Sequence, residues 1–222
     1  MAYRRAMTGK IFYLSIYILL MLWAILQFYP ILFLFMTSTK TDAEIMRNIW
    51  GFPQAPSFRN FILARKREAL KIHISRYFLN SVIVTGGTLG LLTITGAMAS
   101  YGLVRYSFPG RPLLGRLLIF AYAIPMHAVL IPVFHLLGNM HLRNNYLGLI
   151  LAYTTFWLPF TILMLYSYFA SFPRELEEAA KIDGLSDWRI FWQIVVPISK
   201  GALSSISIVN FVGVWSELLL GL

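Results

Sequence analysis

The sequence contains no cysteine. This absence excludes disulfide bonds, thiolate metal sites and a cysteine nucleophile. The chain also shows no group of His, Asp and Glu residues with the spacing of metal ligands, and no nucleophile motif. We therefore expect neither a metal site nor a membrane-embedded enzyme.

Charged residues are scarce, at 13% of the 222 residues, while 58% are hydrophobic. Globular proteins average about 25% charged and 45–50% apolar residues. Only nine residues are acidic against 19 basic ones, which gives a net charge of +10. The basic residues fall in the segments between apolar runs, where lipid headgroups attract them. The charge therefore indicates membrane lipid as a partner, and we expect no nucleic acid.

Long apolar runs alternate with short charged ones, as in proteins that cross a membrane several times. A spanning helix needs about 20 apolar residues, and unpaired strand edges are too costly in lipid. We predict an all-α, polytopic membrane helix bundle that forms one transmembrane domain, 1–222. The first run is too long for a signal peptide, whose apolar region has about 7–15 residues. The predicted spans are 11–36, 78–103, 114–137, 146–169 and 201–222.

The distribution of basic residues favours a cytoplasmic N-terminus only weakly. With that orientation, ten basic residues fall inside and nine fall outside, eight of them in the polar segment 37–77. The arginine pair near the N-terminus and the segment 105–116, which has three arginines and no acid, favour this orientation.

A second polar segment follows the fourth span and holds five of the nine acids, Glu175, Glu177, Glu178, Asp183 and Asp187. Pro173 suits the first turn of a helix, and the early glutamates favour its N-terminal end. Gly184 ends that helix, and a second one follows until Pro197 limits it. These residues predict two short helices around a glycine turn. They leave open whether the hairpin binds another protein or packs on its own spans.

The stretch "EEAAKIDGLSDWRIFWQIVVPISKGAL" resembles the EAA loop of ABC importer permeases. Five further stretches are similar to the carbohydrate, maltose-type branch of the type I importers: "YPILFLFMTSTKT", "ISRYFLNSVIVT", "LIPVFHLL", "SFPRELEEAAKIDG" and "NFVGVWSELL". The resemblance implies a multi-pass protein of the bacterial inner membrane. It places segment 37–77 outside and the EAA loop, 171–200, in the cytoplasm as the coupling element.

The resemblance implies four kinds of partner: cytoplasmic ATPase subunits that bind the ATP, a second permease subunit, an extracytoplasmic solute-binding protein and membrane lipid. It implies that this chain binds no cofactor itself. The sequence itself has no Walker A motif. The expected coupling residues are Glu178, Ala179, Ala180, Asp183 and Gly184. Hypothetical contacts to a transported sugar are Asn210, Trp215 and Glu217. A permease for a non-sugar solute, or a non-ABC channel or carrier, stays open.

Two further expectations concern the ends and faces of the spans. The family usually has a sixth span, and this chain stops at Leu222, so we expect that the last span is missing through truncation. In the second span, small residues share a stripe that predicts close packing within the chain, with a subunit interface as the alternative. The stripe consists of Gly86, Gly90, Thr93, Ala97 and Ser100.

Overall fold

The computed structural model describes residues 2–65 and 74–217, and this part of the chain is helical without any strand. The chain divides into two units, Met1–Arg76 and Tyr77–Leu222. Three of the described helices are long and apolar enough to cross a membrane, or up to five if each of two bent helix pairs is one span. The expected all-α, polytopic architecture is therefore confirmed.

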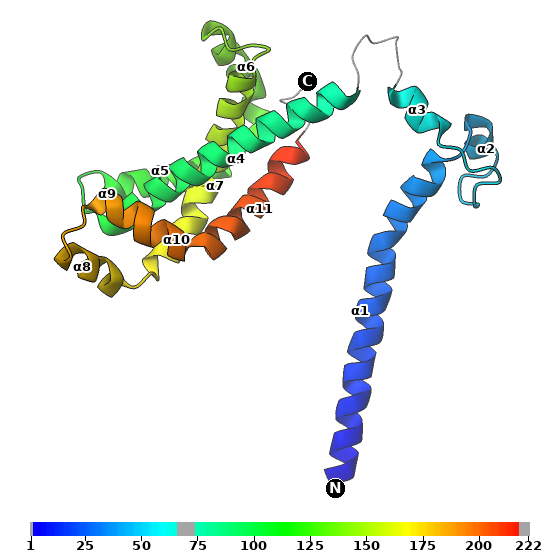
Figure 1. Cartoon of the computed structure of the whole chain (residues 1–222), viewed down its shortest axis with the longest axis horizontal. Coiled ribbons are helices and arrows are strands. Elements are labelled where there is room, and N and C mark those ends of the chain that lie inside the picture. The colour runs from blue at the N-terminus through cyan, green and yellow to red at the C-terminus, as the bar shows by residue number, and fades with distance from the viewer. Residues whose placement is uncertain (1, 66–73, 218–222) are drawn as a thin grey trace. The chain divides into compact units, whose positions relative to one another are not determined.

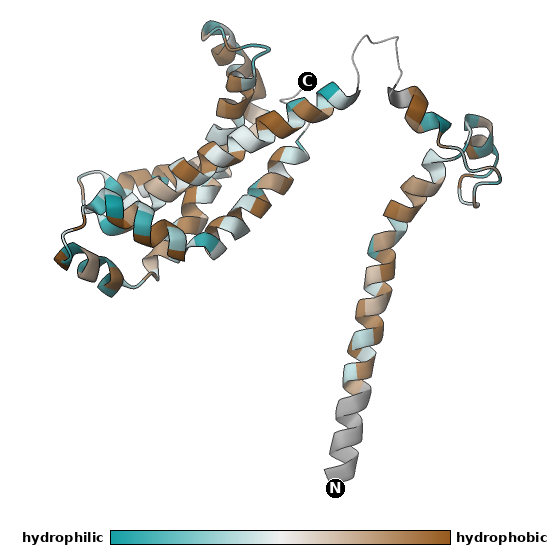
Figure 2. Ribbon diagram, in the orientation of Figure 1, coloured by the Kyte–Doolittle hydropathy of each residue, from teal (hydrophilic) through white to brown (hydrophobic). Residues whose placement is uncertain are grey.

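The first unit consists of α1 (Ala2–Ser38), α2 (Asp42–Arg47) and α3 (Arg59–Arg65). No residue of the apolar part of α1, Phe12–Ser38, is buried in the described structure. Figure 2 shows that many residues of this helix are hydrophobic. Lys40 is buried after α1, and its Nζ donates hydrogen bonds to the carbonyls of Asn48 and Ile49, at 2.9 and 3.0 Å. The ammonium group thus satisfies carbonyls beyond the end of α2, which have no partner within that helix.

The second unit is a bundle of α4, α5, α7 and α11 with a short helical hairpin at one end (Figure 1). The hairpin, α8 and α9, follows the end of α7, and α6 lies at the opposite end of the bundle. The elements are α4 (Ile74–Arg105), α5 (Arg111–Ala123), η2 (Met126–Val129), α6 (Leu130–Asn139), α7 (Tyr146–Ala170), α8 (Arg174–Ile182), α9 (Asp187–Ile190), η3 (Phe191–Val195), α10 (Val196–Ile198) and α11 (Lys200–Trp215).

Glycines bring α4 close to α7, but they are not those of the expected stripe. A Cβ added at Gly96 would lie 2.6 Å from the Thr161 side chain, whereas a Cβ at Gly86 or Gly90 would meet nothing within 4 Å. Among the described residues, Gly86 and Gly90 therefore do not form the close helix contact that was predicted for them. The other three members of the stripe do lie at contacts. Thr93 hydrogen-bonds Ser207 of α11 at 3.1 Å, and both Ala97 and Ser100 are buried.

The third apolar run, 114–137, is not one straight helix. Its two halves, α5 and the pair η2–α6, differ in direction by 94°. Ile124 has an extended backbone, with φ −75° and ψ 119°, and Pro125 follows it. A residue before proline is pushed out of the helical region by steric contact with the proline ring, which explains the break.

The last apolar part of the chain is also bent, by 75°, between Asp187–Ile198 and α11. The expectation that Pro197 ends the second hairpin helix is corrected, because the helix continues to Ile198. A π-helical turn precedes Pro197, in which the Val196 N–H donates to the Phe191 carbonyl five residues earlier. This wider turn accommodates a proline that has no N–H to donate. Of the expected span 201–222, residues 218–222 lie outside the described residues.

Candidate functional site

The hairpin turn is built around Gly184, whose φ is +80°. The Leu185 N–H donates to the Ala180 carbonyl, and the Gly184 N–H donates to the Lys181 carbonyl, both at 3.0 Å. This pair of bonds is the Schellman arrangement, which satisfies carbonyls at a helix end and requires a left-handed residue. The predicted glycine turn is thus present, and a side chain at this position would strain the backbone.

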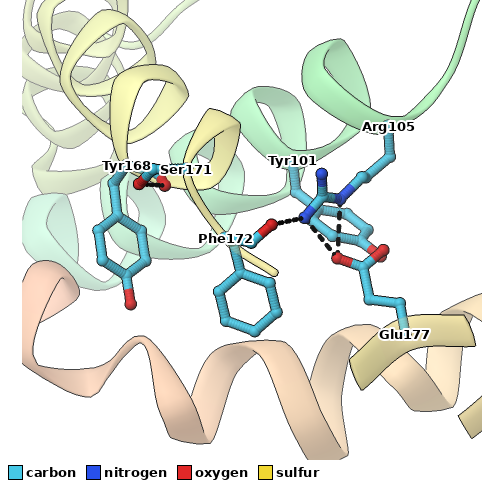
Figure 3. Close-up of polar contacts among 6 residues, drawn as sticks. All are labelled: Tyr101, Arg105, Tyr168, Ser171, Phe172 and Glu177. Atoms are coloured by element: carbon cyan, nitrogen blue, oxygen red, sulfur yellow. Dashed lines mark hydrogen bonds and ion pairs between the residues drawn. The ribbon is translucent and has the colours of Figure 1, made fainter. Parts of the chain in front are cut away.

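A buried ion pair holds the root of the hairpin to the end of α4 (Figure 3). Both Nε and Nη2 of Arg105 lie 2.7 Å from Oε1 of Glu177 in α8. The two side chains are only 8% and 9% exposed. Removing two charges from water is costly, so such a pair needs further hydrogen bonds to be tolerated.

Two neighbours supply those hydrogen bonds. The Tyr101 hydroxyl donates to Oε2 of Glu177 at 3.0 Å, so both carboxylate oxygens accept a bond. Arg105 Nη2 also donates to the carbonyl of Phe172, in the linker between α7 and α8, at 2.9 Å. Tyr101 and Arg105 are four residues apart in α4 and therefore lie on one face of that helix. The cluster thus joins α4, the linker and α8.

An apolar core lies beneath the same hairpin. Its members from the hairpin region are Ala180, Ile190, Phe191 and Val195. They pack with buried residues of α4, α7 and α11, which are Ala97, Tyr101, Val104, Leu165, Phe169, Leu203 and Ile206, and with Phe172 of the linker. Because the ion pair and this core act on the same elements, we expect the hairpin to move with the bundle as one body.

The outer face of the hairpin is different, because acids and large apolar side chains lie there in the open. Glu178, Ala179 and Asp183 are exposed. Ile182 is 87% exposed and Trp188 is 60% exposed. Figure 2 shows this mixture of strongly polar and strongly apolar residues on α8 and α9. Exposed apolar side chains grouped with charges are typical of surfaces that bind another protein.

A second ion pair crosses the turn on the surface. Lys181 Nζ lies 2.9 Å from Asp187 Oδ1, and the side chains are 56% and 48% exposed. The hydrogen bond from Lys181 lowers the pKa of Asp187, and the same bond raises the pKa of Lys181. Burial, and then the nearby charge of Asp187, raise the pKa of Tyr106, so its hydroxyl stays neutral beside this pair.

Comparison with known proteins connects this hairpin to a family. The family of binding-protein-dependent transport system inner membrane components matches residues 92–222, more than half of the chain and all of the hairpin. The chain belongs to this family.

Individual members of the permease family cover most of the chain. The diacetylchitobiose uptake system permease protein NgcG of Streptomyces coelicolor is 39% identical over 91% of this chain and 66% of its own length. The sulfoquinovosyl glycerol transport system permease protein SmoH of Agrobacterium fabrum is 33% identical over 87% and 67%. The chain thus spans about two thirds of the length of these relatives.

A solved structure shows the same fold. It is the crystal structure of a bacterial ABC transporter involved in the import of the acidic polysaccharide alginate. The match has a TM-score of 0.74 and 23% sequence identity, and it covers 94% of this chain and 72% of the other.

The structure separates the five expected coupling residues into different roles. Three of them, Glu178, Ala179 and Asp183, lie on the exposed face. Ala180 is only 4% exposed and packs in the core, while Gly184 forms the turn. Two apolar residues of α8, Leu176 and Ile182, are also exposed.

Sequence reasoning missed the buried cluster of Glu177, Arg105 and Tyr101. One signal was available: Glu177 lies three residues before Ala180, so the two share a helix face. The partner in α4 is 72 residues away in the chain, and no local pattern indicates it.

The three expected sugar contacts lie along α11 and its end. Asn210 is buried, and its Nδ2 donates to Thr161 Oγ1 of α7 at 2.9 Å. Trp215 is 40% exposed and stacks on Phe211, with ring centroids 5.5 Å apart. Glu217 accepts a hydrogen bond from the Tyr153 hydroxyl at 2.6 Å. Two of the three therefore contact α7, and Trp215 presents the most accessible side chain.

Proposed function

We propose that this permease is the membrane-spanning subunit of an ATP-driven importer for a sugar or oligosaccharide, in a bacterial inner membrane. It binds no cofactor itself. Separate cytoplasmic ATPase subunits bind and hydrolyse the ATP, in keeping with the lack of a Walker A motif in this chain. The ATPase subunits move the hairpin, and the bundle then opens alternately to either side of the membrane.

One observation carries this proposal: the hairpin has a buried, hydrogen-bonded root and an exposed outer face. Arg105 and Glu177 fix the root, while Ile182, Glu178 and Asp183 project from the outer face. A rigid lever needs both properties, because force applied to the outer face reaches the spans only if the root does not yield.

The other partners are a second permease subunit and an extracytoplasmic solute-binding protein. The description of the family as binding-protein-dependent supports the latter. The names of NgcG and SmoH, which refer to diacetylchitobiose and sulfoquinovosyl glycerol, support a sugar-containing substrate. Trp215 is the preferred candidate for stacking on a sugar ring, while Asn210 and Glu217 position the adjoining helix surface by their bonds to α7.

Cross-linking from the hairpin tests the coupling role. The chain has no cysteine, so a single Ala179→Cys gives a unique reactive site on the exposed face. Ala180→Cys is the matched control, because this neighbouring alanine is buried. In native membranes, we expect a cross-link from position 179 to an ATPase subunit, identified by mass spectrometry and altered by ATP, and little product from position 180.

Equal yields from both positions, or no ATPase product from a folded and abundant protein, would contradict the coupling role and favour a channel or carrier without a motor.

The substrate class has a separate test. Uptake of a labelled disaccharide should be inhibited by related sugars and not by peptides or phosphate, and the reverse result favours a permease for another solute.

A further inference from the structure

A cavity of about 350 Å³ lies in the second unit between α4, α5 and α7. Its walls are mostly apolar and include Leu103 of α4, Leu118 of α5 and Ile162 of α7. Gly115 forms part of the wall, and a Cβ there would meet nothing within 4 Å. The volume is in the range of small-molecule sites, about 300–1,000 Å³.

A positively charged side chain, that of Arg111, lines one part of this cavity. Arg111, the first residue of α5, is half-buried, and its Nη2 lies 3.4 Å from the Tyr166 hydroxyl, which is a long contact. The sequence contains no acidic residue between Glu68 and Glu175. The two ion pairs of the described residues use Arg105 and Lys181, so Arg111 has no carboxylate partner there.

The arginine and the apolar walls together favour a ligand that has both an anionic group and a hydrocarbon chain. A half-buried guanidinium without a carboxylate is stabilised by an anion, and the planar guanidinium group matches phosphate oxygens well. The apolar walls suit a hydrocarbon chain. Arg111 begins an apolar helix, RPLLGRLLIFAYA, and arginines at the ends of such helices lie at headgroup level in a bilayer.

We propose that this cavity is a binding site for an anionic phospholipid. The phosphate accepts hydrogen bonds from Arg111 and from the Tyr166 hydroxyl, and one acyl chain lies along Leu103, Leu118 and Ile162. Basic pockets between membrane helices bind anionic headgroups in this way. The site requires only that the bundle lies in a membrane. It does not depend on which solute is transported.

Native mass spectrometry of the full purified chain tests the headgroup contact. The probes are phosphatidylglycerol and phosphatidylcholine with the same acyl chains. Arg111→Gln should reduce retention of phosphatidylglycerol about fivefold, as expected for one arginine near an anionic headgroup. Retention of phosphatidylcholine should fall less, because its phosphate is neutralised by its own choline. Arg116→Gln is the matched control, because Arg116 has the same charge, is exposed and does not line the cavity. Equal losses in both variants would mean general attraction by charge and would overturn the site.

Gly115 provides two tests of the acyl chain. Gly115→Leu fills the cavity without changing any charge, and it should also reduce retention of phosphatidylglycerol; unchanged retention would overturn the proposal. Gly115→Cys gives a unique thiol in the cavity wall. In membranes, its reaction with a maleimide should slow as the phosphatidylglycerol content rises. A cross-link from this thiol to another protein would instead show that a protein helix covers the cavity, which contradicts a lipid site.

Discussion

The hairpin holds two ion pairs of similar length in opposite surroundings. Arg105 and Glu177 lie 2.7 Å apart with side chains 8% and 9% exposed, whereas Lys181 and Asp187 lie 2.9 Å apart with side chains 56% and 48% exposed. The buried pair joins residues 72 positions apart, and the exposed pair only closes the turn around Gly184. Distance alone therefore does not tell which pair is structurally important.

The degree of burial determines how much each ion pair contributes to stability. Water screens an exposed pair, which contributes about 0–1 kcal/mol. Loss of one partner from a buried pair leaves an uncompensated charge and costs about 3–5 kcal/mol. Arg105 and Glu177 therefore anchor the hairpin, and Lys181 and Asp187 have only a local role.

The largest expected effect comes from Arg105→Met. It leaves the Glu177 carboxylate buried without its cation, and we expect a loss of about 3–5 kcal/mol in the free energy of unfolding. Denaturation of the purified protein in detergent, followed by circular dichroism, measures this loss.

The matched control is Arg116→Met, which removes an exposed arginine and should cost less than about 0.5 kcal/mol. The double variant Arg105→Met, Glu177→Met should recover most of the lost stability, because it leaves no unpaired charge. A double variant that is less stable than Arg105→Met alone would contradict this explanation.

A smaller loss is expected at the turn. Gly184 has a φ of +80°, and an alanine there should cost about 1–2 kcal/mol. Gly201→Ala is the control, because Gly201 has no positive φ and a Cβ there meets nothing within 4 Å. The same unfolding measurement applies, and equal effects of the two substitutions would disprove a special role for the turn.

Asp187→Asn should have a still smaller effect. The exposed bond to Lys181 contributes less than about 1 kcal/mol, and salt screens it. We expect the difference in melting temperature between this variant and the parent chain to shrink as sodium chloride is raised. A loss as large as that of Arg105→Met would show that exposure does not separate the two pairs.

The pH dependence of the exposed pair should be the smallest effect. The pKa of Asp187 is lowered from 3.8, so its contribution is present above that value and is lost as the pH falls through the folded-state pKa. The pKa of Lys181 is raised from 10.5, so its contribution is present below that value and is lost as the pH rises further. The melting difference between the parent chain and Asp187→Asn should thus stay constant from about pH 5 to 9. A change within that window would point to another titrating group.

The hairpin could be predicted from the sequence because its signals are local. Acids at the start of α8 and Gly184 after its end fix a helix and a turn without help from the rest of the chain. The division between its faces could not be predicted. Glu177 and Glu178 are adjacent and chemically alike, yet the first is buried beside Arg105 of α4 and the second is exposed.

For the membrane spans too, the sequence predicted the position of a helix but not its direction. Apolar length correctly predicted a helix close to 146–169, which is α7, Tyr146–Ala170. The same criterion could not predict the 94° bend within 114–137, because length and composition do not report direction. The break lies at Pro125, but the presence of a proline does not determine the angle between the two halves.

The central claim is that the hairpin and the bundle form one rigid body. The most direct measurement is the distance between two spin labels, attached at Ala179→Cys on the hairpin and Thr155→Cys on the exposed side of α7. We predict one narrow distance distribution in the parent chain, which broadens when Arg105→Met removes the buried cation. A broad distribution in the parent chain, unaffected by Arg105→Met, would contradict the claim, because the hairpin would then move independently of the helices that it is proposed to drive.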